Sequence, residues 1–173
     1  MSFQKERSQI GQAVYALSTF RDGVREYRSS TEAARDYLNS QIFPLSPEMP
    51  DSRRERIVKI TAVTAMMQRL HCLIFNSSPT PKLIEQSHLV GAIIDPYDGM
   101  IDDAELPTAL QFGIDLFNVF KEERPPQKNL GNRDNETLFY KYFNVLWNKI
   151  PFQENEGFWH VLKSLHTVQV LSI

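Results

Sequence analysis

A short segment between two apolar stretches gathers acidic side chains at spacings that suit metal chemistry. Residues 91–110, GAIIDPYDGMIDDAELPTAL, contain no Lys or Arg and five carboxylates: Asp95, Asp98, Asp102, Asp103 and Glu105. On a helix, Asp95, Asp98 and Asp102 would fall within an arc of about 60°, because positions i, i+3 and i+7 nearly overlay. Crowded carboxylates raise one another's pKa unless a cation lies among them, and Mg²⁺ prefers carboxylate, water and phosphate oxygens. The spacing therefore predicts a Mg²⁺ site that handles pyrophosphate.

The wider stretch LVGAIIDPYDGMIDDAELPTAL resembles the aspartate-rich helix of class I isoprenoid synthases, the all-α enzymes of prenyl transfer and terpene cyclisation. In that family an apolar helix ends in a D-D-x-x-D type motif and another apolar helix follows, as residues 110–120 do here. The resemblance implies a Mg²⁺-dependent prenyl transferase or terpene cyclase that removes diphosphate from an allylic prenyl diphosphate. It assigns Asp98, Asp102 and Asp103 as metal ligands, with Asp95 assisting.

This chemistry needs an apolar pocket beside the metal. Metal ions neutralise a leaving diphosphate, and an enclosed site keeps the reacting group away from water. The chain has 11 Phe, 6 Tyr and 2 Trp, which is enough to line such a pocket. Aromatic residues serve more often as core, so their number alone does not establish a pocket.

A second interpretation assigns the same charges to helix capping. Carboxylates favour helix N-termini because they accept hydrogen bonds from free N–H groups and complement the helix dipole. Asp95 before Pro96 has the form of an N-cap and first helical residue, and Asp102-x-x-Glu105 with Pro107 gives a second such signal. The chain would then be a non-catalytic helical domain that binds a protein partner or a second copy of itself.

A third interpretation is a calcium loop. DGMIDDAEL matches the second half of an EF-hand loop, with Asp98 before Gly99 and with Glu105 at the position of the bidentate ligand. The first half of the loop lacks oxygen ligands, since Ile94 and Pro96 stand at its positions 1 and 3. The calcium alternative is therefore a degenerate EF-hand-like site.

The composition limits the class of protein. A chain of 173 residues with 42% hydrophobic and 23% charged residues predicts one globular domain over residues 1–173 with a substantial core. A net charge of −2 predicts no nucleic-acid partner. The single cysteine, Cys72, lies in the apolar run LHCLIF and is predicted to be a buried hydrophobe in a reducing compartment. With no signal peptide or membrane-length apolar run, we expect a cytoplasmic protein without a transmembrane segment.

Apolar spacing and helix start signals predict an all-α bundle of about six or seven helices. Capping boxes that begin at Ser29 and Ser52, and Thr80 followed by Pro81, mark three of the starts. The segment EERPPQKNLGNRDN is predicted to be a loop. The expected helices span about residues 4–28, 29–42, 52–75, 81–94, 110–120, 135–150 and 155–171.

Four further segments carry structural expectations. The aromatic segment FYKYFNVLWNKIPF is predicted to be a core helix, and DSRRERIVK a solvated face with weak ion pairs. The C-terminal segment is apolar to its last residue, and we expect one of two explanations. Either it docks into the core, or the protein continues beyond Ile173 and these residues are the first part of a class I isoprenoid-synthase-like fold. One apolar stripe of the 52–75 helix is expected to face the core: Ile57, Ile60, Val63, Met67, Leu70 and Ile74.

Overall fold

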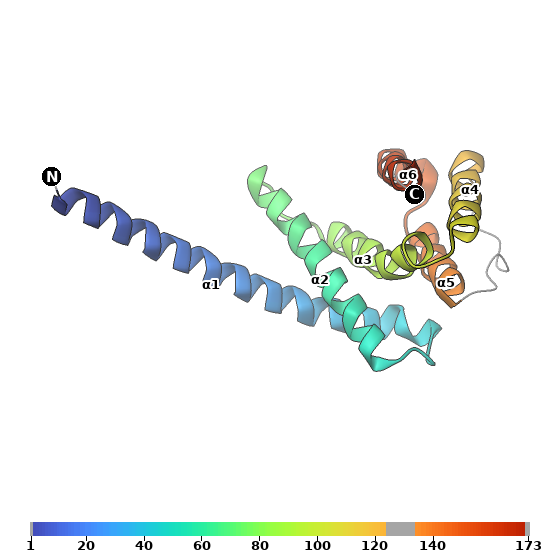
Figure 1. Ribbon diagram of the computed structural model, residues 1–173, viewed down its shortest axis with the longest axis horizontal. Coiled ribbons are helices and arrows are strands. Elements are labelled where there is room, and N and C mark those ends of the chain that lie inside the picture. The colour runs from blue at the N-terminus through green and yellow to red at the C-terminus, as the bar shows by residue number, and fades with distance from the viewer. Residues whose placement is uncertain (1, 124–133, 172–173) are drawn as a thin grey trace.

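The computed structural model describes residues 2–123 and 134–171, and within them it contains helices and no strands. This confirms the predicted all-α fold and the expected number of helices (Figure 1). The predicted loop EERPPQKNLGNRDN falls largely on residues 124–133, outside the described residues. The helices are α1 (Ser2–Gln41), η1 (Phe43–Leu45), α2 (Asp51–Ile74), α3 (Pro81–Ile101), α4 (Leu106–Glu122), α5 (Asp134–Lys149), η2 (Phe152–Glu154) and α6 (Glu156–Leu171).

Helix α3 is the centre of the arrangement. It packs against α2 on one side and α5 on the other, and it also contacts α1 and α4. The long helix α1 lies against α2, and its N-terminal part extends away from the other helices (Figure 1). Helices α4 and α6 pack together at the opposite end of the molecule. The acidic segment therefore lies on the helix that touches the most neighbours.

Helix α1 is continuous through Gln41, so the predicted start at Ser29 is wrong. The region contains no proline to interrupt the backbone hydrogen bonds. Instead of capping a new helix, the Thr31 hydroxyl donates a hydrogen bond to the Tyr27 carbonyl oxygen one turn earlier, at 2.7 Å. Ala34 and Leu38 are fully buried on the same helix. Burial of this face against the neighbouring helices favours one uninterrupted helix over two short ones.

Helix α2 begins at Asp51, one residue before the predicted cap. Glu55, the predicted partner of that cap, instead accepts a hydrogen bond from Arg35 of α1, with 3.0 Å between Nη2 and Oε2. The prediction that the large apolar stripe faces the core is wrong for the C-terminal half of α2. The exposed fractions there are 43% for Val63, 58% for Met67 and 77% for Ile74.

Small residues explain which face of α2 is buried. Thr61, Ala62 and Ala65 are buried, and Gly91 of α3 lies directly opposite Thr61. A Cβ atom added to Gly91 would lie 2.5 Å from the Thr61 Cα atom, which is closer than two carbon atoms can approach. The two helices thus meet backbone to backbone through their small face, and the larger side chains of α2 point outward.

Helix α3 starts as predicted. Thr80 is its N-cap, whose side chain accepts a hydrogen bond from the Leu83 N–H at 3.2 Å, and Pro81 follows. The helix continues through Asp95 and Pro96 to Ile101, so Asp95 caps nothing. Residues 94–101, the first eight positions of the proposed EF-hand-like loop, are helical in this structure and do not have the extended loop conformation of an EF-hand.

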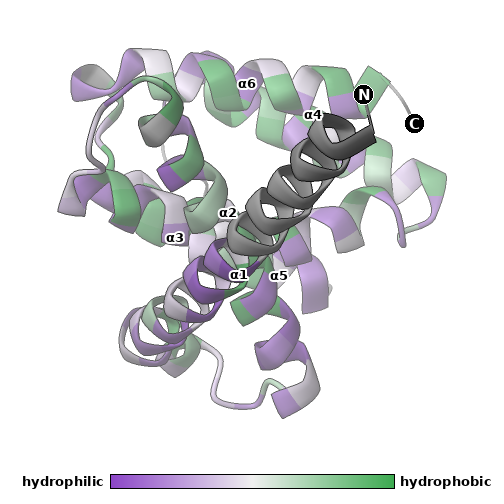
Figure 2. Cartoon of the chain, turned by 90° about the vertical axis from the view of Figure 1, so that its left-hand side faces the viewer, coloured by the Kyte–Doolittle hydropathy of each residue, from purple (hydrophilic) through white to green (hydrophobic). Residues whose placement is uncertain are grey.

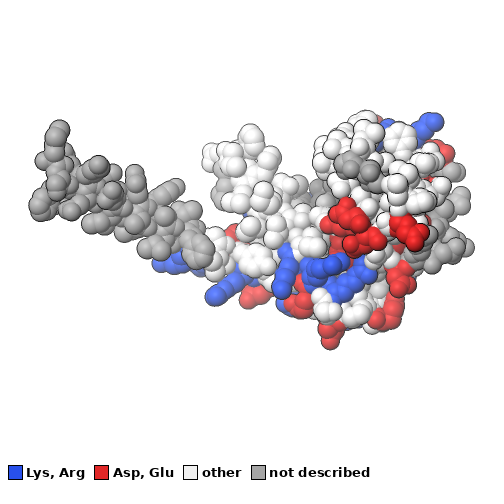
Figure 3. Space-filling model, in the orientation of Figure 1, with Lys and Arg blue, Asp and Glu red and all other residues white. Residues whose placement is uncertain are grey.

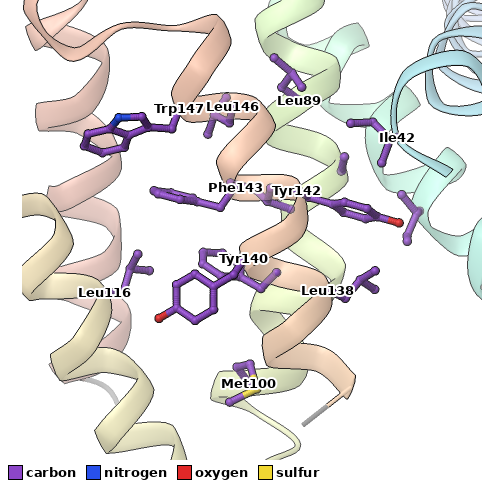
Figure 4. Close-up of a cluster of buried hydrophobic side chains, with 14 of the residues drawn as sticks. Ile42, Leu89, Met100, Leu116, Leu138, Tyr140, Tyr142, Phe143, Leu146 and Trp147 are labelled. Carbon is purple, nitrogen blue, oxygen red and sulfur yellow. The ribbon is translucent and has the colours of Figure 1, made fainter. Parts of the chain in front are cut away.

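The core is centred on α5, as predicted for FYKYFNVLWNKIPF. Side chains leave this helix toward two sides: Tyr142 points toward α1 and Ile42, whereas Tyr140 and Phe143 point toward Leu116 of α4 (Figure 4). Phe143 also contacts Trp159 of α6, with ring centroids 5.8 Å apart. Burying these aromatic rings joins the α1–α3 side of the molecule to the α4–α6 side.

Helix α6 docks with one face only. Trp159 and His166 are buried, and Trp159 Nε1 donates a hydrogen bond to the Ile150 carbonyl oxygen at 2.9 Å. Hydrophobic and hydrophilic residues alternate along this helix (Figure 2), and Leu165 and Val168 remain exposed. Cys72 of α2 is a buried free thiol, as predicted. Within the described part of the chain, no helix combines the length and apolar character that a membrane span requires.

Candidate functional site

Asp95 is buried beneath the end of α3 and bonded to two arginines of α2. Its side chain has no exposed area, Oδ2 accepts from Arg53 Nε at 2.8 Å, and Oδ1 accepts from Arg56 Nε. Arg53 also donates from Nη2 to Asn135 Oδ1 of α5 at 2.6 Å. Both carboxylate oxygens are therefore occupied, and the network joins α2, α3 and α5. Removing either partner would leave a buried charge uncompensated, so Asp95 is not available to a metal ion without loss of the arginines.

Sequence reasoning missed the role of these two arginines in the network. The segment DSRRERIVK was predicted to be a solvated face with weak ion pairs, and this is wrong for Arg53, whose side chain is 23% exposed. The available signal was the spacing of Arg53 and Arg56, which are three residues apart on one helix face. Nothing in that spacing identified Asp95 as their partner, because the contact depends on how α2 packs against α3.

The other predicted metal ligands lie at the solvent-exposed end of α3. Asp98, Asp102 and Asp103 are all exposed, and Asp102 is the C-cap residue, whose backbone N–H donates to the Asp98 carbonyl oxygen at 2.7 Å. Partial burial raises the pKa of the Asp98 carboxyl, the negative charges of Asp102 and Asp95 raise it further, and Arg56 opposes them. The surrounding acids thus make the Asp98 carboxyl harder to ionise, and a cation would relieve this repulsion.

Within the described residues, no three His, Cys, Asp or Glu side chains are arranged to hold a metal ion together. Asp98 and Asp102 remain as a pair one helical turn apart, with Asp103 adjacent in sequence. Mg²⁺ commonly binds through one or two carboxylates and completes its octahedral shell with water and phosphate oxygens. The pair has the donor chemistry for that kind of site, in which the ligand itself supplies part of the coordination.

Gly99 lies between these acids and is buried against α5. A Cβ atom there would overlap the Asn135 side chain, the same side chain that accepts from Arg53. The close approach of α3 and α5 therefore leaves no room for a side chain at the position that follows Asp98.

A cavity of about 310 Å³ lies among α3, α4, α5 and α6. Its wall is mostly apolar and aromatic and includes Tyr97, Phe120, Phe139 and Phe143. Asp98 is the one carboxylate among the described lining residues. Asp98 therefore lines the apolar cavity and also lies beside the exposed acids Asp102 and Asp103.

A hydrogen-bonded chain fixes the cavity wall beside Asp98. Nε2 of His166 lies 2.9 Å from the Gly113 carbonyl oxygen, and Nδ1 lies 2.9 Å from the Tyr97 hydroxyl. A carbonyl only accepts, so Nε2 carries the hydrogen and Nδ1 accepts from Tyr97. Burial lowers the pKa of His166 and raises the pKa of Tyr97 to about 12, so both are neutral near pH 7.

No family model, curated protein or solved structure matches the chain. Arg56 lies within electrostatic reach of the acids at the end of α3, because Asp103 and Asp98, together with its bonded partner Asp95, raise the pKa of its guanidinium. Figure 3 shows Lys and Arg side chains bordering Asp and Glu side chains on one face of the molecule.

Proposed function

We propose that the protein binds a prenyl diphosphate together with Mg²⁺, as the resemblance to class I isoprenoid synthases implies. The apolar prenyl chain occupies the cavity among α3 to α6. The diphosphate remains outside, coordinated through Mg²⁺ by Asp98 and Asp102, with Asp103 beside them. The observation that carries this proposal is that Asp98 belongs both to the apolar cavity and to the exposed acidic end of α3.

Charge and exposure support the position of the diphosphate. The Arg56 side chain is 59% exposed and within electrostatic reach of Asp98 and Asp103. Its guanidinium uses Nε for Asp95, which leaves its terminal nitrogens as donors for a phosphate oxygen. A magnesium ion between the carboxylates and the phosphates supplies the charge that these two anionic groups need to approach each other.

The size of the cavity limits the prenyl chain. A volume of about 310 Å³ lies near the lower end of the roughly 300–1,000 Å³ typical of small-molecule sites. We therefore expect short prenyl diphosphates to bind more tightly than long ones. Tyr97, Phe139 and Phe143 provide the apolar contact surface, and neutral His166 adds no competing charge.

Thermal unfolding with and without ligand tests this proposal. Dimethylallyl or geranyl diphosphate with Mg²⁺ should stabilise the protein by about 2.7 kcal/mol at 100 times Kd, roughly 5–10 °C in Tm for a chain of this size. EDTA should abolish the shift. Asp98→Asn should reduce the shift relative to its own ligand-free Tm, whereas Asp36→Asn, an exposed carboxylate on α1, should not. No shift at millimolar ligand and Mg²⁺ would refute the proposal.

Pyrophosphate separates the two parts of the site. It should give a smaller Mg²⁺-dependent shift than geranyl diphosphate, because it lacks the chain that fills the cavity. Equal shifts would show that the acidic end of α3 binds phosphate without the cavity. A shift with geranyl diphosphate that survives EDTA would remove Mg²⁺ from the proposal.

A second candidate function is protein–protein interaction, and the outer face of α2 favours it. Val63, Met67, Leu70 and Ile74 form an exposed apolar stripe at helical spacing. This candidate expects a dimer, or a larger assembly, in size-exclusion chromatography with light scattering. Met67→Glu should convert that assembly to a monomer. A wild-type protein that is monomeric at high concentration, with a Mg²⁺-dependent ligand shift, would favour the diphosphate site instead.

A further inference from the structure

A second hollow lies away from the acidic end of α3, among α1, α2 and α3. Its volume is about 580 Å³, and it shares no described lining residue with the cavity beside Asp98. One part of its lining is apolar and comes from Tyr37, Pro79, Pro81 and Ile84. We call this hollow the α1–α3 cleft.

Two polar atoms of residues that line the α1–α3 cleft have no hydrogen-bond partner within the described part of the chain. They are Nε2 of His88 and Nε of Arg69, and both atoms are buried. His88 is 4% exposed, and its ring lies against Tyr37 with the centroids 5.1 Å apart. Buried donors without acceptors are costly, and native proteins rarely leave two of them beside one hollow.

Arg69 and Lys149, two bases near the cleft, are already paired with acids. Arg69 donates from Nη1 to Glu26 at 2.6 Å, and Glu85 accepts from Lys149 Nζ at 2.6 Å and from the Tyr37 hydroxyl at 3.3 Å. Asp36 adds a further exposed carboxylate to the lining. An added anion would meet these three acids, whereas an uncharged oxygen acceptor would bond to the two donors without that repulsion.

Burial and the nearby Arg69 charge lower the pKa of His88, so its imidazole is neutral near pH 7. Either of its nitrogens can carry the hydrogen, and Nε2 is therefore available as a donor. Both residues line the cleft while the two unpaired atoms are themselves buried, so a ligand reaches these atoms only after the imidazole and the guanidinium rotate toward the cleft. The apolar wall around Tyr37 and Pro79 suits the remainder of such a ligand.

We propose that the α1–α3 cleft binds a small uncharged molecule with a carbonyl oxygen on an apolar body. The carbonyl oxygen accepts hydrogen bonds from Arg69 Nε–H and His88 Nε2–H. The apolar body lies against Tyr37, Pro79 and Ile84. This site is independent of the diphosphate site, and either can exist without the other.

Two probes of similar size test the proposal on the full chain. N-methylbenzamide carries an uncharged carbonyl and benzoate a carboxylate on the same ring. Nitrogen-15 NMR of the Arg69 Nε–H and the His88 imidazole should show saturable shifts with N-methylbenzamide in the millimolar range. Benzoate should bind at least tenfold more weakly, because it meets Glu26, Glu85 and Asp36.

Variants assign the shifts to the two donors. Arg69→Lys keeps the positive charge beside Glu26 and removes the Nε donor, and His88→Phe keeps a ring against Tyr37 and removes both nitrogens. Each should weaken amide binding at least fivefold, with His88→Phe melting no lower than wild type, because it removes an unpaired buried atom. Arg25→Lys, on the exposed part of α1, should bind as wild type does.

Three results would overturn the proposal. The first is no saturable shift with N-methylbenzamide at either side chain, which would mean that the two atoms bond only to water. The second is equal binding of benzoate, which would remove the requirement for an uncharged ligand. The third is wild-type affinity in His88→Phe, a variant that is expected to fold even where Arg69→Lys does not.

Discussion

Asp95 and Asp98 lie one helical turn apart on α3 and have opposite surroundings. Asp95 is fully buried and bonded to Arg53 and Arg56, whereas Asp98 is exposed beside other acids. The inner acid is part of the packing of three helices. The outer acid is less favourably placed in its charged form and gains from any added cation. Both residues are aspartates on the same helix. The neighbouring helices therefore decide which carboxylate is bonded within the core and which stays exposed to a ligand.

The largest effect in this comparison is expected from the inner acid. Asp95→Asn should lower the free energy of unfolding by about 3–5 kcal/mol, because it leaves the largely buried Arg53 without its charge partner. Urea denaturation at pH 7 measures this change. Asp98→Asn, one turn away, is the matched control and should cause no such loss. A change below about 1 kcal/mol in Asp95→Asn would contradict the structural role assigned to this network.

The close contact of α2 and α3 is expected to be the next most sensitive feature. Gly91→Ala should destabilise the protein by about 1–3 kcal/mol, because the new methyl group overlaps the Thr61 backbone and forces the helices apart. Gly23→Ala on α1, where an added Cβ meets nothing within 4 Å, should instead stabilise by up to about 1 kcal/mol. Equal effects of the two substitutions in thermal unfolding would show that α2 and α3 are not in backbone contact.

The two arginines sharpen the comparison, because they share Asp95 but differ in exposure. Arg53→Met should cost about 2–3 kcal/mol, since Arg53 is mostly buried and also bonded to Asn135. Arg56→Met should cost about 1 kcal/mol or less, since its side chain is 59% exposed. Chemical denaturation of both variants gives the order. A larger loss of stability in Arg56→Met than in Arg53→Met would contradict the prediction that Arg53 is the more important partner of Asp95.

The smallest effect should come from Asp98, and here the substitution should stabilise the protein. The folded state raises the pKa of Asp98, so the contribution of this group to stability is present below its unfolded pKa of about 3.9. It is lost as the pH rises through the higher folded value. Asp98→Asn should therefore raise the Tm at pH 7, with the gain vanishing near pH 3. Thermal unfolding of both proteins from pH 3 to 7 tests this, and a lower Tm for the variant at pH 7 without added cation would contradict it.

Local signals in the sequence predicted much of the secondary structure. Thr80 and Pro81 mark the start of α3 because a hydroxyl cap and a residue without an N–H suit the first helical turn. The aromatic run of α5 predicted a buried helix because aromatic residues serve most often as core. The capping box at Ser29 failed because its residue types are equally compatible with a helix interior, and packing against α2 and α3 favours a continuous α1.

The candidate site was predicted only in part. The acidic residues were identified, because five carboxylates without a basic residue are conspicuous in any sequence. Their division between Asp95 and the exposed acids was not identified, nor was the hydrogen-bonded pair of Tyr97 and His166, whose partners are 69 residues apart. No periodicity within a helix reports which residue of a distant helix it meets.

The sequence by itself determined that the chain forms helices, where several of them begin, and that acids gather near the end of one. These properties depend on backbone hydrogen bonds and side chains within a few residues of each other. Only the tertiary structure decided which faces are buried. On α2 the small face packs closely against Gly91 and leaves Met67 and Ile74 exposed, and the same close approach brings Arg53 to Asp95. Burial depends on how near two helices can come, and that distance is a property of the pair.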